Sequence, residues 1–324
     1  MRAAVCSSLT GPDGITLETL PDPVPKEGEV VVRVKAAALN FLDTLITRGR
    51  YQYKPEGAFS PAAEIAGVVE SLGPGSTRLK PGDRVAGYIG WGGAREKVAV
   101  KESLLAPVPA GVDDNTAAAV SVTYGTAIHG LKDRALLKAG ETVAVLGASG
   151  GAGLAAIEVA KLLGARVIAV ASTAEKLEVC RAGGADLLLN YAETDLKQGL
   201  RELTGGKGVD VVYDCVGGEH TEAAIRSIAW EGRFLVVGFA AGQIPKVPIN
   251  LMLLKNCALV GVFWGEMVTR HPDRQRTNMD ELMGWIASGR LRPHLHATLP
   301  LEKTAEGIRL IDARKVTGKV VITI

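Results

Sequence analysis

The segment Thr142-Val-Ala-Val-Leu-Gly-Ala-Ser-Gly-Gly-Ala-Gly153 is the most informative part of this chain about its fold. Its first part, Thr142–Leu146, is a short apolar run that predicts a buried strand. A glycine-rich turn follows, and then a segment with small residues on one face, Leu154–Leu163, which predicts a helix. The next apolar run, Arg166–Ala171, completes a strand–helix–strand unit. This order is typical of a parallel β-sheet covered by helices.

The glycine-rich turn predicts a dinucleotide-binding loop. Glycine lets the backbone turn tightly and approach a pyrophosphate without a Cβ clash. A helix beginning near Ala152 would direct its free N–H groups and the positive end of its dipole at the phosphates. A purely structural turn is the alternative. The residues expected to bind the cofactor here are Gly147, Ala148, Ser149, Gly150, Gly151, Ala152 and Gly153.

The end of the second strand indicates which dinucleotide binds. An NAD site usually has Asp or Glu there, because the carboxylate binds the ribose 2′-hydroxyl. This chain has Ser172 and Thr173, with Lys176 one turn into the next helix. Hydroxyls and an ammonium suit a 2′-phosphate, whereas a carboxylate would repel it. The sequence therefore favours NADPH over NADH, and we expect Glu175 to face solvent.

The rest of the chain predicts an α/β protein with two domains. Residues 1–118 contain short β-like runs between turn formers, as in a barrel-like, mainly antiparallel domain. Residues 119–263 alternate strands and helices, which is typical of a doubly wound Rossmann sheet. Residues 264–324 carry two amphipathic helices and a terminal strand, and we expect this tail to complete the first domain.

Composition excludes several classes of function. The 37 basic and 35 acidic side chains nearly balance, so there is no electrostatic footprint for nucleic acid. No apolar stretch is long enough to span a membrane, and the first residues are too polar for a signal peptide, so we expect a cytoplasmic protein. The cysteines are scattered without a CxxC spacing, which predicts reduced thiols at Cys6, Cys180, Cys215 and Cys257.

Further motifs occur along nearly the whole chain: Leu39-Asn-Phe-Leu-Asp-Thr44, Glu64 with Ala66-Gly67, Lys80-Pro-Gly-Asp-Arg-Val85, Tyr124-Gly-Thr-Ala127, Lys207-Gly-Val-Asp-Val-Val-Tyr-Asp214 and Thr317-Gly-Lys-Val-Val321. Together with the glycine loop, they resemble the zinc-independent, NADPH-dependent quinone oxidoreductases of the medium-chain dehydrogenase superfamily. The resemblance implies a GroES-like catalytic domain made of both chain ends, with a Rossmann domain between them. It also implies a homodimer formed by Rossmann edge strands, near Leu259–Phe263 in this chain.

The same resemblance implies roles for individual residues. Lys176 and Tyr191 would bind the 2′-phosphate, although Tyr191 also fits an ordinary aromatic residue at a strand end. Gly238 and Phe239 match the segment beside the nicotinamide.

Zinc alcohol dehydrogenases of this superfamily hold their catalytic metal with a cysteine, a histidine and a further cysteine or acidic residue. Here the position of the first cysteine reads Ala38-Leu39-Asn40, and the usual Gly-His-Glu reads Ala62-Ala63-Glu64. His294 and His296 are close in sequence, but no cysteine or carboxylate cluster accompanies them. We therefore expect no metal.

Chemistry without a metal favours hydride addition to an electron-poor carbon of a quinone or enone. Asn40 is the candidate for a polar contact to the nicotinamide-side pocket or the substrate oxygen, or it caps a local turn. Tyr51 is expected either to donate a hydrogen bond or proton, or to wall the pocket. Thr126 is expected to touch the nicotinamide or substrate. Phe263 and Trp264 are expected to line the substrate cleft or to pack between domains.

Two alternatives remain open. One is an acryloyl-CoA or enoyl-thioester reductase, because hydride delivery to a β-carbon is the same chemistry. For that enzyme, the segment Arg270–Arg276 would offer cations to the phosphates of coenzyme A; otherwise it is a solvated loop before a helix. The other is a non-catalytic NADPH-binding protein with a structural or RNA-binding role.

Overall fold

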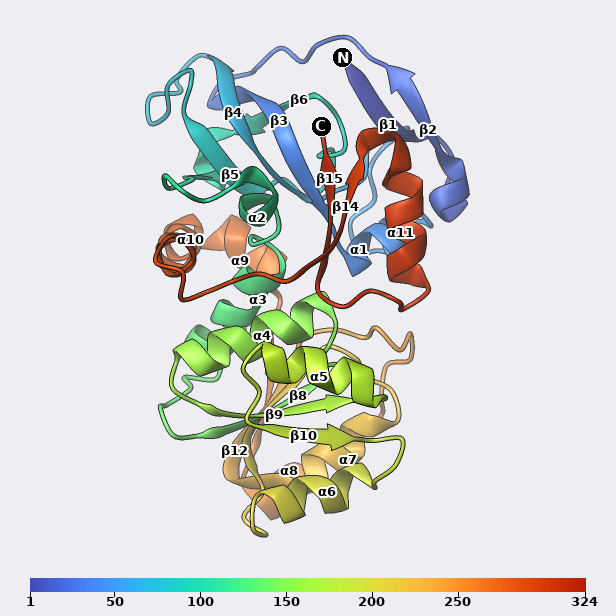
Figure 1. Ribbon diagram of the computed structural model, residues 1–324, viewed down its shortest axis with the longest axis vertical. Helices are drawn as coiled ribbons and strands as arrows, with labels where there is room; N and C mark the ends of the chain where they lie inside the picture. The colour runs from blue at the N-terminus through green and yellow to red at the C-terminus, as the bar shows by residue number, and fades with distance from the viewer. The chain divides into compact units, whose positions relative to one another are not determined.

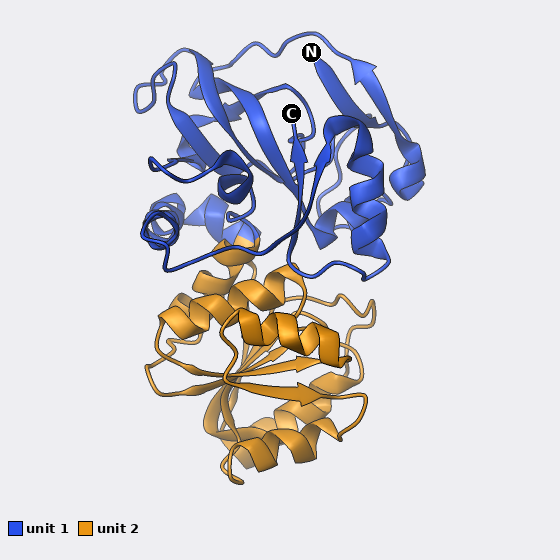
Figure 2. Ribbon diagram, viewed as in Figure 1, with its two compact units in different colours: residues 1–122, 265–324 blue, residues 123–264 orange.

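The computed structural model describes residues 1–324 and divides the chain into two compact units. Unit 1 contains Met1–Val122 and Gly265–Ile324, and unit 2 contains Thr123–Trp264 (Figure 2). The sequence placed the boundaries at 118/119 and 263/264. The first boundary lies four residues beyond helix α2 (Asp114–Ala118), and Val122, the last residue before it, donates its backbone N–H to Glu64 of unit 1.

Unit 1 is built on a seven-stranded sheet in the order β14-β15-β3-β4-β5-β7, with β6 also paired to β3. Its pairs are antiparallel except β14 with β15. The last strand pairs with β3, and Val320 lies opposite Leu39, so both ends of the chain contribute to one sheet (Figure 1). The strands are β3 (Glu29–Leu39), β4 (Glu64–Leu72), β5 (Arg84–Tyr88), β6 (Lys97–Lys101), β7 (Leu105–Pro107), β14 (Leu295–Pro300) and β15 (Lys319–Thr323).

The remaining elements of unit 1 surround this sheet. A two-stranded sheet is formed by β1 (Arg2–Cys6) and β2 (Ile15–Thr19). The helices are α1 (Phe41–Ile46), α2, α9 (Trp264–Arg270, whose first residue ends unit 2), α10 (Pro272–Ala287) and α11 (Thr304–Asp312).

Unit 2 is a parallel six-stranded sheet in the order β10-β9-β8-β11-β12-β13. Within this unit, α4 and α5 cover one face and α6, α7 and α8 the other (Figure 1). The strands are β8 (Thr142–Leu146), β9 (Arg166–Ala171), β10 (Leu187–Asn190), β11 (Val209–Asp214), β12 (Ile228–Val236) and β13 (Ala258–Gly261). The helices are α3 (Thr123–Ile128), the π-helix His129–Arg134, α4 (Gly151–Leu162), α5 (Ala174–Ala182), α6 (Leu196–Leu203), α7 (His220–Arg226) and α8 (Asn250–Lys255).

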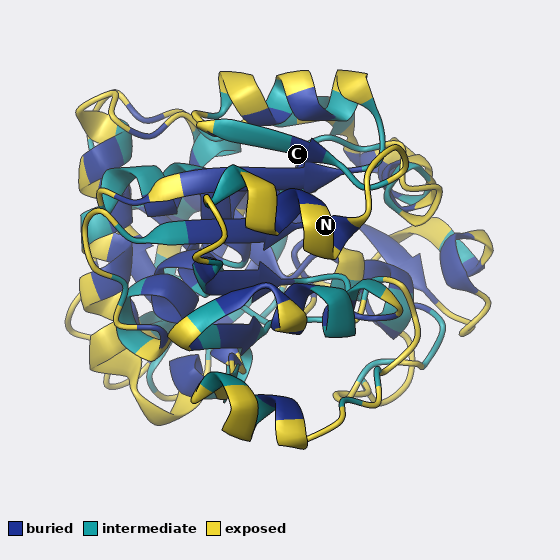
Figure 3. Cartoon of the chain, turned by 90° about the horizontal axis from the view of Figure 1, so that it is seen from below, coloured by how far each residue is buried: buried dark blue, intermediate teal, exposed yellow.

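The central strands of both units are buried, while the helices present exposed faces (Figure 3). In unit 2, burial on both faces explains why β8, β9 and β11 read as continuous apolar runs. The predicted α/β fold class, with a Rossmann sheet and a mainly antiparallel β domain, is confirmed. No helix has the length and apolar character that crossing a bilayer requires.

The interpretation of Arg270–Arg276 as a loop was wrong. Arg270 ends α9, and Pro272 begins α10, where its fixed φ and missing N–H suit the first helical turn. Arg270 pairs with Glu266, and Arg276 pairs with Asp273, so both guanidinium groups already have carboxylate partners.

Candidate functional site

The glycine-rich turn of unit 2 has a backbone that side chains would block. Gly147 has a φ of +69°, and a Cβ there would lie 2.5 Å from a methyl of Val216. A Cβ on Gly153 would lie 2.3 Å from the carbonyl oxygen of Gly147. Helix α4 begins at Gly151, directly after Gly150, so its first N–H groups have no partner within the helix. This cradle fits the pyrophosphate of a dinucleotide.

A buried carboxylate shapes the neighbouring loop after β11. Asp214 accepts hydrogen bonds from the backbone N–H groups of Val216 and Gly217, at 2.8 and 2.9 Å. Its second oxygen accepts one from the hydroxyl of Thr221 at 3.0 Å. Val216 is thereby held against Gly147. No role for Asp214 is predicted from the sequence, because an aspartate at the end of a strand has many structural uses.

Ser172 and Lys176 lie together at the carboxyl edge of β9, and the backbone of Tyr191, the first residue after β10, lies beside the end of β9. The Nζ atom of Lys176 lies 3.5 Å from the hydroxyl of Ser172. The backbone N–H of Tyr191 donates to Ala171, which precedes Ser172. Thr173 caps α5 by accepting from the N–H of Lys176, and Glu175 is exposed, as expected. The charged group beside Ser172 is therefore an ammonium, which is the kind of group that binds a phosphate.

Tyr191 also has an aromatic neighbour that the sequence did not indicate. Its ring lies 4.5 Å from the ring of His220, centroid to centroid, at an angle of 50°. Both residues line a surface hollow of about 470 Å³ beside the start of α6.

Gly238 and Phe239 follow β12 at the same edge of the sheet. Gly238 donates its N–H to the carbonyl of Asp214, and a Cβ on Gly238 would lie 3.3 Å from the carbonyl oxygen of Cys215. Phe239 is partly exposed and lies against Gly217. These contacts bring the segment next to the loop after β11, which in turn touches the glycine-rich turn.

Phe263, Trp264 and Thr126 differ in their surroundings. Trp264 is buried, and its indole lies 2.9 Å from where a Cβ on Gly125 would be, so this ring packs onto α3. Thr126, the next residue of α3, is half-buried. Phe263 is half-exposed.

Unit 1 contains a buried polar network that joins three strands. The ammonium of Lys319, at the start of β15, donates to Glu64 Oε1 at 2.7 Å, to Asn40 Oδ1 and to the carbonyl of Leu39. Asn40 Nδ2 donates to the same Glu64 oxygen at 2.9 Å. The exposed fractions of Lys319, Glu64 and Asn40 are 2%, 0% and 6%. Sequence reasoning noted Glu64 and Lys319 within motifs but gave neither a function.

Asn40 is thus bound by the protein on both sides of its amide. Its Nδ2 group also lies 3.4 Å from the carbonyl of Ala38, and the residue precedes helix α1 as its N-cap. A hydrogen bond from Asn40 to a substrate oxygen would therefore require one of these contacts to open. The position expected of a metal-ligating cysteine instead holds an amide that is fixed by a cation and a carboxylate.

Asp43 lies beneath this network and is completely buried. One oxygen accepts from the N–H of Asn40 and the other from the N–H of Ala62, each at 2.8 Å. Burial raises the pKa of Asp43 to about 6, although the two hydrogen bonds and Lys319 oppose the shift.

Tyr51 packs against the small apolar cluster of Cys6, Ile46 and Phe59. Burial, together with the nearby carboxylate of Asp43, raises the pKa of Tyr51. Its ring lies 6.1 Å from that of Tyr53, which donates a hydrogen bond to Glu266 at 2.9 Å. The Tyr51 hydroxyl itself has no hydrogen-bond partner among the 324 residues, so it is free to donate to a ligand.

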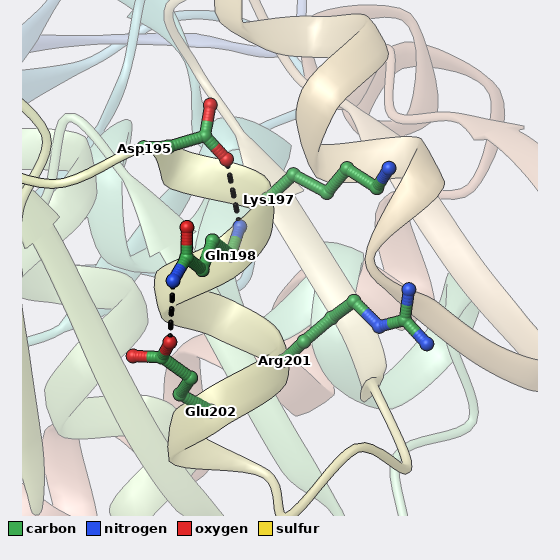
Figure 4. Close-up of a pocket in the computed structure, with 5 residues that line it drawn as sticks. All are labelled: Asp195, Lys197, Gln198, Arg201 and Glu202. Carbon is green, nitrogen blue, oxygen red and sulfur yellow. Dashed lines mark hydrogen bonds between the residues drawn. The ribbon is translucent and has the colours of Figure 1, made fainter.

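A second hollow in unit 2, of about 410 Å³, lies on the outer face of α6 (Figure 4). Its lining residues are Asp195, Lys197, Gln198, Arg201 and Glu202. Asp195 caps the helix and Gln198 donates to Glu202, so the face is a solvated helix surface outside the glycine cradle. No group of three or more His, Cys, Asp or Glu side chains lies close enough together to hold a metal ion.

Comparison with known proteins agrees with this geometry. Residues 26–110 match the alcohol dehydrogenase GroES-like domain family, and residues 151–287 match the zinc-binding dehydrogenase family. These two matches define a medium-chain dehydrogenase.

Individual relatives show to which group of medium-chain dehydrogenases the chain is similar. The chain is 39% identical to the quinone oxidoreductase-like protein 2 of Bos taurus, over 100% of this chain and 92% of the relative. It is 30% identical to the human quinone oxidoreductase, over 99% and 97%. The structure of the Escherichia coli quinone oxidoreductase complexed with NADPH superposes with a TM-score of 0.92 at 28% identity, covering 100% of both chains. The chain belongs to the NADPH-dependent quinone oxidoreductase family of the medium-chain dehydrogenases.

The raised pKa of Asp43 predicts how stability depends on pH. A carboxyl whose pKa is higher in the folded than in the unfolded protein contributes stability below about pH 4, and this contribution is lost as the pH rises through about 6. A shift of about two units corresponds to roughly 3 kcal/mol. The Asp43→Asn variant cannot titrate at this position and serves as the reference. From about pH 4 to about pH 7, the free energy of unfolding of the wild type, minus that of Asp43→Asn, should fall by roughly 3 kcal/mol.

Denaturant titrations of both proteins at several pH values measure this difference. A difference that instead grows with pH would show that the two backbone hydrogen bonds outweigh burial.

Proposed function

We propose that this protein reduces quinones or related activated enones with NADPH, by direct hydride transfer and without zinc. The observation that carries the proposal is the pairing of Lys176 with Ser172 at the carboxyl edge of β9, where a carboxylate would select NAD. The residues of unit 1 support the absence of zinc, because Asn40 and Ala63 stand where zinc relatives have cysteine and histidine.

NADPH, when bound, supplies the hydride, and the chain has to position two reactants and exclude water. We assign the pyrophosphate to the cradle Gly147–Gly153 and the 2′-phosphate to Ser172, Thr173, Lys176 and Tyr191. Gly238, Phe239 and Thr126 would contact the nicotinamide. In unit 1, Asn40 would contact the nicotinamide side of the pocket or, with its 3.4 Å contact to Ala38 opened, donate to the substrate oxygen. The free hydroxyl of Tyr51 would donate a hydrogen bond or a proton to the reduced oxygen. Phe263 would contribute apolar surface to the acceptor pocket.

The activity is tested by loss of NADPH absorbance with a panel of acceptors. The panel contains 1,4-benzoquinone, 9,10-phenanthrenequinone, a 2-alkenal and acryloyl-CoA, each with and without a chelator. We expect turnover of the quinones that the chelator does not change. Preference for acryloyl-CoA would move the substrate class to thioesters. Tight NADPH binding with no turnover would contradict the proposed enzyme and favour a non-catalytic NADPH-binding protein.

Lys176 is expected to decide cofactor preference. A hydrogen bond to a charged group contributes about 1.5–3 kcal/mol, so Lys176→Ala should raise the Kd for NADPH roughly 10- to 100-fold. The Kd for NADH should change less than about twofold, because NADH has no phosphate for this ammonium to bind. Lys197→Ala removes an exposed lysine of the same unit and should change neither value (Figure 4). If Lys176→Ala weakened NADPH and NADH binding equally, the assignment of Lys176 to the 2′-phosphate site would be contradicted.

We also propose a homodimer through strand β13. This strand is the edge of the unit 2 sheet. Leu259 within it and Phe263, two residues after it, expose 44% and 52% of their surface. An unpaired apolar edge favours association with a second strand. We expect wild type to sediment as a dimer and Leu259→Lys as a monomer, while Leu9→Lys, at an exposed leucine of unit 1, stays dimeric. Monomeric wild type, or a dimer unaffected by Leu259→Lys, would contradict the proposal.

A further inference from the structure

The buried ion pair of unit 1 is connected both to a candidate site residue, Asn40, and to the backbone at Val122. Glu64 uses Oε1 for Lys319 and Asn40, and its Oε2 accepts from the backbone N–H of Val122 at 2.7 Å. Val122 is the last residue of unit 1 before the chain enters the nucleotide-binding unit at Thr123. One carboxylate therefore links a candidate site residue to the segment at which the chain leaves unit 1.

The ammonium of Lys319 determines which way the amide of Asn40 faces. Its donors are directed at three acceptors: the Glu64 carboxylate, the Leu39 carbonyl and Asn40 Oδ1. Because an ammonium only donates, Asn40 must direct its oxygen to Lys319 and its Nδ2 group to Glu64. A flipped amide would place its NH₂ group against the ammonium and its oxygen against the carboxylate. Both contacts would be repulsive in a site without water to screen them.

We propose that Lys319 and Glu64 are positioning residues, which fix the orientation of Asn40 and hold the chain at Val122 for the reaction. The proposal rests on the proposed function, because the effect on catalysis requires Asn40 to face the acceptor. The residues concerned are far apart in the sequence. Lys319 lies 255 positions after Glu64 and 279 positions after Asn40. Neither Lys319 nor Glu64 has to touch the substrate.

The test distinguishes an effect on catalysis from an effect on stability. It removes the charge of Lys319 alone, and then the charges of Lys319 and Glu64 together. Lys319→Met leaves the Glu64 carboxylate buried without its cation, so we expect Tm to fall by roughly 10 °C. The double variant Lys319→Met/Glu64→Gln contains neither charge and nearly preserves volume, so most of this fall should be regained. A positioning role predicts that kcat of the double variant nevertheless stays at least about tenfold below wild type, while its Kd for NADPH changes less than about twofold.

The control is the exposed ion pair Lys303–Glu306, removed as Lys303→Met/Glu306→Gln. This variant should retain the kcat and the Tm of wild type, because exposed pairs contribute little to stability. A Lys319→Met/Glu64→Gln protein with wild-type kcat would overturn the proposal and leave the pair a structural role.

A second measurement tests whether Lys319 and Glu64 orient Asn40 even if the proposed enzymatic function is wrong. If wild type reduces no acceptor, the function fails, and hydrogen exchange of the Asn40 side-chain amide, followed by NMR, still tests the orientation. We expect both Nδ2 hydrogens to be resolved and slow to exchange in wild type, and to exchange at least about tenfold faster in Lys319→Met/Glu64→Gln. Equal exchange in both proteins would show that Lys319 and Glu64 do not hold the amide.

Discussion

The ion pair between Lys319 and Glu64 joins parts of the chain that are far apart in sequence. It connects the start of the last strand, β15, with the start of β4, and it includes the end of β3 through Asn40. Both charges have left water, so their stability depends on complete hydrogen bonding, which the structure provides. Because β3, β4 and β15 are adjacent or next-nearest strands of one sheet, the pair also requires the C-terminal segment to complete that sheet.

In unit 2 the main constraint is a different one: the backbone of the glycine-rich turn has to come close to the dinucleotide. Gly147 and Gly153 have no room for a side chain, and Asp214 fixes the adjacent loop through three hydrogen bonds. These features make a cradle at the carboxyl edge of the sheet, where doubly wound folds bind their ligands. We propose that cofactor specificity is decided one strand away, where Lys176 and Ser172 stand in place of the carboxylate of an NAD site.

Much of this arrangement could be predicted from local sequence. The strands Thr142–Leu146, Arg166–Ala171 and Val209–Asp214 have the predicted bounds, because burial on both faces makes each an uninterrupted apolar run. Strand β14 was missed because its side chains alternate between exposed and half-buried, and α9 was missed because it is only seven residues long. The ion pair could not be predicted, since spacing along a chain does not show that Lys319 lies against Glu64. The sequence does show that Glu64 and Lys319 each stand at the edge of an apolar run, which is the signal that could have indicated them.

We propose direct hydride transfer from NADPH in a protein without zinc. The decisive measurement is the rate of quinone reduction with NADPH deuterated at both C4 positions, in protein whose zinc content has been measured. We expect a slower rate with the deuterated cofactor in zinc-free, fully active protein. An equal rate under conditions where the chemical step limits turnover, or activity that follows the zinc content, would contradict it.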